Sequence, residues 1–360
     1  MSEDRTATTL LLVADSSASD ALRPLTALRG WLAERDVDLQ VRSYGQVSGG
    51  LPPAAGSTVV ILCFPHTFWD SGVEGRLPGP YGTQAYAQAL HTYLLRIGQK
   101  LADTAGGSLR YLNAPGAVAL TRDKAAAQAR LKQCGVPVPE VLQSPRPRDV
   151  LAELDRGSSL YVKAVCGSMG KGMAHLAPGR WRTNYRYGGR DLLAPGEPAG
   201  RSDWESREQW LFREVPEGDR GFLELLCDTR GFLFEREIEP RGDGALRTEF
   251  RITVAGGTVA AADERTAPRD ALTTRRAEGG TGRTADPADP GVHAASRAAV
   301  RAAGALGLSY AVFDVVSGAD GEPYVVDTTA FPATGTPAEL WQDLLDLLVV
   351  RPAVGARPAV

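Results

Sequence analysis

The stretch YVKAVCGSMGKGM, residues 161–173, decides how this sequence is interpreted, because it combines lysines and glycines as phosphate-binding loops do. Lys163 lies in an apolar run, and Gly167, Gly170 and Gly172 follow it. A P-loop requires G-x-x-x-x-G-K-[ST], but here the first two glycines are too close and a glycine replaces Ser or Thr. The spacing also breaks the dinucleotide fingerprint G-x-G-x-x-G. The rest of the chain must therefore decide which chemistry this loop serves.

Composition describes an ordinary globular chain. Its 360 residues suffice for two or three domains, with 43% hydrophobic and 23% charged residues. A net charge of -3 gives no general attraction to nucleic acid or to a membrane surface. The start, MSEDRTATTLLLVADSS, lacks the pattern of a signal peptide, and no apolar run is long enough to span a bilayer. The four cysteines form no C-x-x-C pair, so neither zinc nor a disulfide framework is expected. We expect a reduced, cytoplasmic protein.

The first part of the chain alternates strand and helix patterns. Buried strands are expected at 8–14, 38–43 and 58–64, and helices at 19–35 and 85–102. This alternation predicts a small, mainly parallel α/β domain. It carries no glycine fingerprint, so a dinucleotide domain is not expected.

The remainder mixes helices with strand-like runs. A helix is expected from Asp123 to Gly135, where V-P-V-P then holds the chain extended. Regular periodicity disappears over 178–207, and a Gly/Thr-rich loop is expected at 278–290. The other expected elements are strands at 161–165, 231–237, 249–254 and 258–265, a helix at 292–306, and strands at 310–316 and 322–329.

Two aspartates stand out in the last pair of strands. Asp314 and Asp327 each lie in a hydrophobic run, and the tight turn S-G-A-D-G-E between the runs predicts a hairpin. Buried carboxylates are costly unless a cation accompanies them, and two that converge suit Mg²⁺. The alternative is that each aspartate ends its strand or accepts from a loop amide.

Taken together, these signals resemble the ATP-grasp superfamily, over roughly residues 116–335. The resemblance predicts a parallel α/β domain followed by a two-lobed ATP-grasp fold, divided into 1–115, 116–237 and 238–350, with an insert near 178–207. Lys124 matches the lysine after an aspartate at the start of the family's first helix, before the G-[IV]-P-x-P segment seen here as GVPVP. FDVV...GEPYVVDTTAFP resembles the family's metal-binding hairpin, and EFRITVAGGTVAAADERT its D-x-R-v-x-V-x-G-G stretch.

The resemblance also implies roles for individual residues. Arg251 and Arg265 would face the transferred phosphate or the substrate carboxylate, and Asp314, Asp327 and Thr329 would bind Mg²⁺. The residues expected to hold ATP are Lys124, Lys163, the loop Gly167, Ser168, Met169, Gly170, Lys171 and Gly172, and the interlobe hinge Glu235, Arg236, Glu237 and Ile238. Two positions depart from the family: Thr329 replaces the usual Asn, and Glu237 occupies a commonly aromatic hinge position.

The activity implied is ATP-dependent ligation of a carboxylate to an amine (or a thiol) through an acyl phosphate, on small-molecule, amino-acid or peptide substrates, in a possible homodimer. Joining these groups requires that the carboxylate oxygen first be converted into a better leaving group, which phosphorylation does. Phosphoryl transfer is itself catalysed mainly by positioning and electrostatics. Alternatives are a small-molecule kinase on the same fold and a nucleotide-binding partner protein without turnover, which Thr329 keeps open.

Other motifs remain ambiguous. The four histidines, 66, 91, 175 and 293, are scattered, which favours surface or local structural roles. The segment PHTFWDSG (65–72) follows a strand and could contact substrate or simply pack. Residues 180–190, RWRTNYRYGGR, with Arg201 beyond them, could bind an anionic or peptide substrate or RNA, or form a surface loop.

Overall fold

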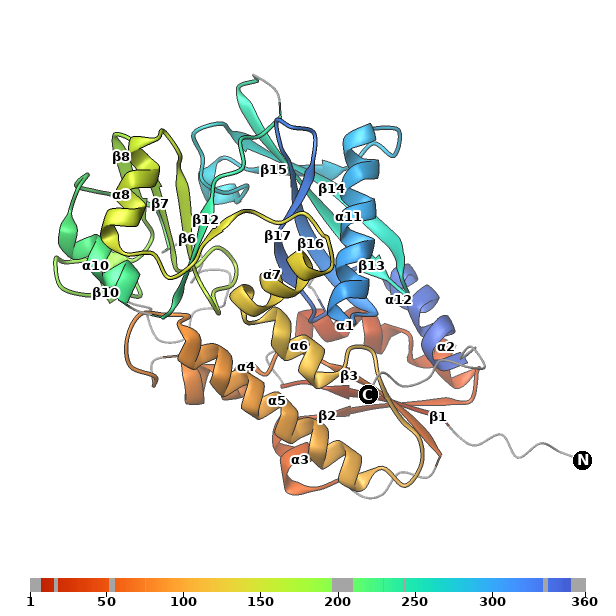
Figure 1. Ribbon diagram of the computed structural model, residues 1–360. Coiled ribbons are helices and arrows are strands. Elements are labelled where there is room, and N and C mark those ends of the chain that lie inside the picture. The colour runs from red at the N-terminus through yellow and green to blue at the C-terminus, as the bar shows by residue number, and fades with distance from the viewer. Residues whose placement is uncertain are drawn as a thin grey trace, which may run out of the picture.

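The computed structural model contains three main sheets, which follow one another along the chain (Figure 1). It describes residues 8–15, 19–51, 56–74, 76–195, 210–228, 230–241, 244–332 and 336–350. Among these residues, no helix combines the length and apolarity that crossing a membrane requires. The fold matches the predicted class, a parallel α/β domain followed by two further lobes, and each of those lobes contains an antiparallel sheet.

The first sheet is parallel and has the strand order β2-β1-β3-β4. Its strands are β1 (Thr8–Val13), β2 (Val37–Arg42), β3 (Ser57–Leu62) and β4 (Leu109–Tyr111). Leu10, Leu12, Val60 and Ile61 are fully buried, because helices cover the sheet. Those helices are α1 (Ser19–Ala27), α2 (Arg29–Ala33), α3 (Tyr44–Gly49) and α5 (Gln84–Thr104). The single helix expected at 19–35 is thus two helices, since Leu28 leaves helical geometry with ψ 3°.

Short helices follow two strands of this sheet, and those after β4 lead to the second sheet. After β3 the chain forms α4 (His66–Phe68) and a π-helical turn, Trp69–Val73. After β4 it forms α6 (Pro115–Thr121) and α7 (Lys124–Gln133). Asp123 caps α7 by accepting from the Ala126 amide at 3.0 Å, which fixes where the helix begins and holds Lys124 in its first turn.

The second sheet is antiparallel, in the order β11-β8-β7-β6-β12-β5. Two helices, α8 (Pro147–Asp155) and α10 (Arg220–Asp228), contact each other beside this sheet. Its strands are β5 (Val141–Leu142), β6 (Leu160–Ala164), β7 (Met173–Ala177), β8 (Arg180–Thr183), β11 (Arg213–Val215) and β12 (Phe232–Arg236).

The prediction of an insert near 178–207 is wrong in part, because some of these residues belong to the second sheet. β8 lies inside the second sheet, between β7 and β11, and Trp181 and Tyr185 are only 1% exposed. The aromatic residues that hid the periodicity therefore belong to the core. A small hairpin follows, formed by β9 (Arg186–Tyr187) and β10 (Leu192–Leu193). Residues 196–209, which include Arg201, lie outside the described residues.

The third sheet is antiparallel, in the order β15-β14-β13-β16-β17. Helix α11 (Pro290–Leu306) covers one face with its alanines (Figure 1). The strands are β13 (Leu246–Ala255), β14 (Thr258–Pro268), β15 (Thr281–Thr284), β16 (Tyr310–Ser317) and β17 (Pro323–Thr329). The loop expected at 278–290 thus contains β15. The chain then forms α12 (Ala338–Leu345), which contacts α1, and the π-helical turn Asp346–Val350.

The division of the chain at 115/116 and 237/238 stays a prediction. Asn113 bridges the first and third sheets, because its side chain donates to the carbonyls of Tyr310 and Ala330 at 2.7 and 2.9 Å. It also accepts from the Ser309 amide at 2.9 Å. These buried hydrogen bonds fix the third sheet against the end of β4.

Candidate active site

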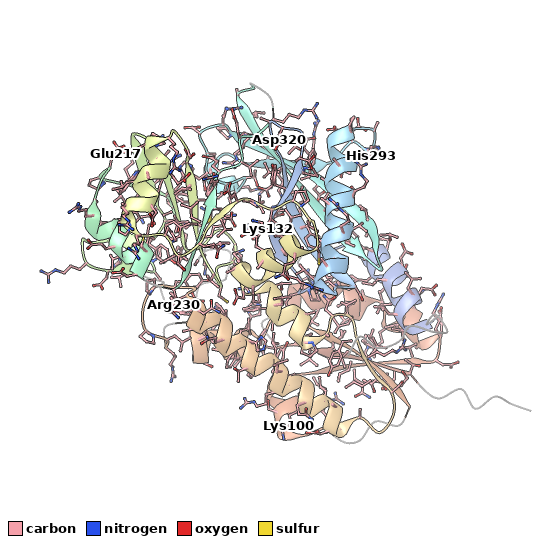
Figure 2. All side chains as sticks on the ribbon, viewed as in Figure 1. Lys100, Lys132, Glu217, Arg230, His293 and Asp320 are labelled. Atoms are coloured by element: carbon pink, nitrogen blue, oxygen red, sulfur yellow. The ribbon has the colours of Figure 1, made fainter. Side chains whose placement is uncertain are left out.

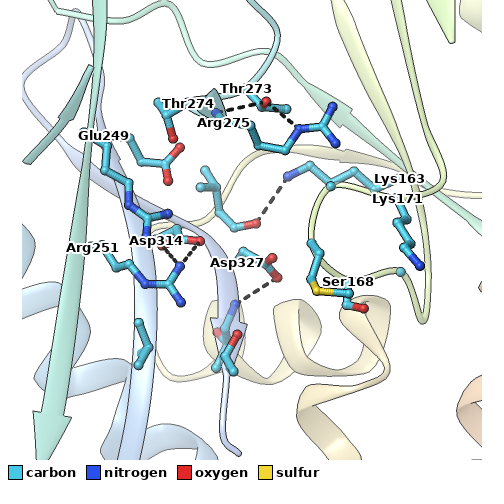
Figure 3. A pocket seen from close by; sticks show the side chains of 18 of the residues that line it. Lys163, Ser168, Lys171, Glu249, Arg251, Thr273, Thr274, Arg275, Asp314 and Asp327 are labelled. Carbon is cyan, nitrogen blue, oxygen red and sulfur yellow. Dashed lines mark hydrogen bonds and ion pairs between the residues drawn. The ribbon is translucent and has the colours of Figure 1, made fainter. Parts of the chain in front are cut away.

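A cavity of about 1050 Å³ lies where the three sheets meet. Its walls are the uncovered face of the third sheet, the edge of the second sheet with the glycine loop, and the loop that follows β3. Figure 3 shows side chains from two of these walls, those of the second and third sheets, pointing toward one another. The cavity thus gathers residues from all parts of the chain.

The third sheet forms a wall of charged side chains. Successive side chains of a strand point to opposite faces, so every second residue of β13 lines the cavity: Arg247, Glu249, Arg251 and Thr253. Asp263 and Arg265 of β14, Asp314 of β16 and Asp327 of β17 share this face. We call Glu249, Arg251, Arg265, Asp314 and Asp327 the charged wall.

Asp314 and Asp327 converge as predicted. They are register partners across the hairpin of β16 and β17, which has a bulge after Asp314. Each is paired with a cation: Arg251 Nη1 donates to both Asp314 oxygens at 3.0 and 3.2 Å, and Lys124 Nζ donates to Asp327. Burial acts to raise the pKa of Asp327, but the charges of Lys124 and Lys163 outweigh it and hold that pKa below its usual range.

The lysine of the opening stretch faces the same centre. Lys163 Nζ lies 2.5 Å from Glu235 Oε2 and donates to the Val326 carbonyl at 3.2 Å (Figure 3). Glu235 is 3% exposed and also accepts from Gln128 at 3.2 Å. Lys163 therefore contacts a strand from each lobe, β12 through Glu235 and β17 through Val326. The Lys163 ammonium group lies beside the hairpin that carries Asp327.

The residues present fit Mg²⁺. Asp314 and Asp327 supply the hard oxygen ligands that Mg²⁺ prefers, and both line an open cavity that phosphate oxygens could enter. Thr329 also lines it, with a hydroxyl in place of an amide oxygen. In the described part of the chain, no group of three or more His, Cys, Asp or Glu side chains is arranged to hold a metal ion, so phosphate oxygens and water would have to complete the coordination.

The glycine loop is held from both sides. Buried Asn184 accepts from the Met173 amide at 2.7 Å and donates to the Gly170 carbonyl at 2.6 Å. Gly172 has φ +72°, and a Cβ there would lie 2.6 Å from the Tyr185 hydroxyl, so no side chain fits. Asn184 and Tyr185, which were part of the predicted insert, thus shape the loop.

Lys171 connects this loop to the first sheet's domain. It is 4% exposed, lies 3.9 Å from Glu74 and sits above the ring of Tyr81 at 5.8 Å. Its side chain is therefore more enclosed than those of Lys124 and Lys163, at 16% and 14% exposure. Gly167, Ser168, Met169 and Gly170 also line the cavity, whereas Gly172 does not.

The hinge residues divide into two groups. Glu235, Arg236 and Ile238 line the cavity, but Glu237 does not. The Glu237 side chain instead lies 2.8 Å from His175 Nε2, and its amide donates to the Ser159 carbonyl at 2.8 Å. The guanidinium of Arg236 turns to Glu140 and Glu153, away from Lys163. Glu237, where the sequence departs from the family pattern, thus makes a side-chain contact with His175 outside the cavity.

Glu249 is a site residue that the sequence interpretation missed. It lies opposite Arg265 in the β13–β14 register. Burial, reinforced by Asp314, raises the pKa of Glu249 to about 7 against the opposing charges of Arg265, Arg247 and Arg251. The signal was available: alternation along E-F-R-I-T puts Glu249 on the same strand face as Arg251.

A segment between β14 and β15, which the sequence analysis did not assign to the site, also lines the cavity. Thr273, Thr274 and Arg275 come from it (Figure 3). Arg275 contacts the lobe of the glycine loop by donating to the Trp210 carbonyl at 3.0 Å. Tyr161 of β6 donates to the Leu272 carbonyl at 3.0 Å. The segment therefore joins the two lobes across the cavity, which local sequence patterns could not indicate.

The four histidines lie in different environments. His91 and His293 are exposed, and Figure 2 shows His293 on the outer side of α11. His175 is buried against Glu237, and His66 lines the cavity. Among the described residues, the histidines bring no metal cluster together.

The fold is similar to that of solved structures, among them an ATP-grasp ligase. The ATP-grasp ligase PsnB, complexed with a minimal precursor, matches with a TM-score of 0.54 and 16% sequence identity, over 94% of this chain and 99% of that one. The D-cycloserine synthetase DcsG matches with a TM-score of 0.53 and 16% identity, over 94% and 98%. No protein-family model and no curated protein sequence matches the chain. The likeness establishes the fold, so the chain has the ATP-grasp fold that its sequence resembled.

Proposed function

We propose that this protein is an ATP-dependent ligase that joins a carboxylate to an amine through an acyl phosphate. The observation that carries the proposal is the convergence of Lys124, Lys163, Asp314 and Asp327 on one cavity of an ATP-grasp fold. Cations from one lobe and carboxylates from the other are what a magnesium–triphosphate complex requires.

The chain's own residues would act mainly by position and charge. Lys124, Lys163 and the amides of the glycine loop would bind the phosphates, and Asp314 and Asp327 would hold Mg²⁺, which would supply Lewis acidity. A substrate carboxylate oxygen then attacks the γ-phosphorus, and ADP leaves. The amine attacks the acyl carbon, loses a proton and expels phosphate.

Arg251 and Arg265 are suited to the anionic centre of this reaction. Arginine's planar fork binds carboxylate or phosphate oxygens in pairs. Arg251 already holds Asp314 through one nitrogen, and Arg265 lines the cavity one strand further out. We assign them to the transferred phosphoryl group or the substrate carboxylate.

Amino-acid or peptide substrates are the class we propose. The similar structures carry names that refer to a precursor-binding ligase and to D-cycloserine synthesis, which supports small amino-acid-like or peptide substrates. The cavity is large enough for both a nucleotide and such a substrate.

The test is product analysis with ATP, Mg²⁺ and pools of amino acids and peptides. We expect ADP and phosphate to form only when both a carboxylate and an amine are supplied, with one amide product per ADP. AMP and pyrophosphate would overturn the acyl phosphate. A stable phosphorylated substrate would favour the kinase alternative, and absence of any turnover with ADP binding intact would favour the nucleotide-binding partner.

A further inference from the structure

The cavity has a second end, bordered on one side by Lys171 of the glycine loop, whose ammonium nitrogen lies 5.8 Å from the centre of the Tyr81 ring. This end is lined by rings that we call the aromatic basin: Phe64, His66, Trp69, Tyr81 and Phe331. The ring of Phe64 is at the centre, 4.9 Å from His66, 5.4 Å from Trp69 and 5.3 Å from Phe331, measured between centroids. Four of the five rings come from the chain that follows β3, where open parallel α/β sheets bind ligands.

A single arginine lies against these rings. The guanidinium carbon of Arg122 is 5.7 Å from the ring centres of both Phe64 and Trp69. Its Nη2 donates to the Cys166 carbonyl at 3.4 Å, just before the glycine loop. The Nε of Arg122 is buried and has no hydrogen-bond partner among the described residues.

A buried N–H group without an acceptor is costly, so this guanidinium is a candidate to receive one from a ligand. The rings restrict its position by cation–π contact, which lowers the entropy lost when an anion binds. Arginine is also the side chain best matched to a carboxylate.

The basin adjoins the charged wall. Arg122 is two residues before Lys124, whose ammonium group contacts Asp327. Phe331 is two residues after Thr329, at the end of the same hairpin. A molecule held in the basin therefore lies next to the place proposed for the γ-phosphate.

The acidic residues at this end of the cavity restrict the class of ligand that can bind there. Asp70 lines the cavity beside the rings, and Glu74 does so with Lys171 at 3.9 Å, so a second or third carboxylate would add negative charge beside Asp70. A single carboxylate with an apolar or aromatic group fits the rings and Arg122, and an ammonium group would be tolerated.

We infer that the aromatic basin binds the side chain of an apolar or aromatic amino acid, while Arg122 binds its carboxylate. This assignment rests on the proposed ligase function and names the substrate class. It makes Arg122 a substrate-binding residue that acts independently of the nucleotide.

The test is direct binding rather than turnover, with L-phenylalanine as the probe and phenethylamine, which lacks the carboxylate, as its partner. Calorimetry is done on the full chain with saturating ADP and Mg²⁺. We expect L-phenylalanine to bind about tenfold or more tightly than phenethylamine, and Arg122→Gln to remove that preference. Arg122→Lys should retain part of it.

The matched control is Arg96→Gln, because Arg96 also lies over a ring, 5.8 Å from Tyr93, outside the cavity lining. ADP affinity and the melting temperature are measured for each variant. Equal binding of both probes, no binding of L-phenylalanine to the wild type, or unchanged binding in a folded Arg122→Gln variant would overturn the inference. An equal loss of ADP affinity would also overturn it, by making Arg122 a phosphate ligand. Because no turnover is measured, these results leave the ligase proposal to its own assay.

Discussion

The charged wall and the aromatic basin face the same cavity but are built in opposite ways. On the charged wall, side chains alternate along long strands and neutralise one another across strands, as Arg251 does for Asp314. The basin gathers rings from the connection between β3 and α5 and from Phe331, which follows β17. The wall is thus a periodic feature that sequence can reveal, and the basin is a product of tertiary contact.

The largest effect is expected on the charged wall. Asp327→Asn keeps the side chain's size but removes the charge that offsets Lys124, so turnover should fall by about 100-fold or more. The measurement is steady-state ADP release, and thermal melting verifies the fold. Asp263→Asn, which lines the same face outside the paired aspartates, is the control. Turnover within about threefold of the wild type would remove Asp327 from the site.

Replacing Lys163 should weaken nucleotide binding more than folding, provided that its partner Glu235 is replaced as well. Breaking a buried pair leaves the other charge unpaired, so Lys163→Met is combined with Glu235→Gln. The double variant should bind ATP about 10- to 100-fold more weakly, because a charge-assisted phosphate contact is lost. Calorimetry checks this, with Glu235→Gln alone as the reference. Equal ATP affinity in both would show that Lys163 does not contact the phosphates.

The raised pKa of Glu249, a residue of the charged wall, predicts that the stability of the folded protein depends on pH. Its pKa is raised to about 7 in the folded protein, above the usual value of about 4.3. Between those values the folded state keeps a proton that the unfolded state releases, so stability should fall as pH rises from about 4.5 to 7. Glu249→Gln should remove this slope, raising the midpoint of thermal unfolding near pH 7.5 by a few degrees.

The comparison is made by melting wild type and variant in parallel at pH 5 and pH 7.5, without nucleotide or metal. Glu239→Gln serves as the control, because Glu239 does not line the cavity. Identical slopes for wild type and Glu249→Gln would mean that this carboxyl ionises normally.

The smallest effects are expected from the arginines of residues 180–190. Arg182 donates to the Asp270 carbonyl at 3.1 Å, and Arg186 is exposed; neither lines the cavity. Arg182→Ala should cost roughly 1 kcal/mol of stability and Arg186→Ala less than about 0.5, with KM unchanged for both. A raised KM in either would restore the substrate-binding interpretation of this segment.

Sequence predicted what depends on local pattern. The hairpin of Asp314 and Asp327, the strand that carries Lys163 and the helix that begins after Asp123 all follow from periodicity and capping. Glu249 could have been found in the same way. The sequence could not reveal that Tyr185 supports Gly172, that Arg122 lies against Phe64 and Trp69, or that β8 is an inner strand, because these depend on contacts between distant segments.

The central claim is that the charged wall and Lys163 form the nucleotide site, with the aromatic basin left for substrate. A crystal structure with the nonhydrolysable analogue AMPPNP and Mg²⁺ tests it most directly. The account predicts phosphates beside Lys124, Lys163 and the glycine loop, the metal on Asp314 and Asp327, and no nucleotide atom against Phe64 or Trp69. Nucleotide bound in the aromatic basin, or phosphates remote from Lys163, would contradict it.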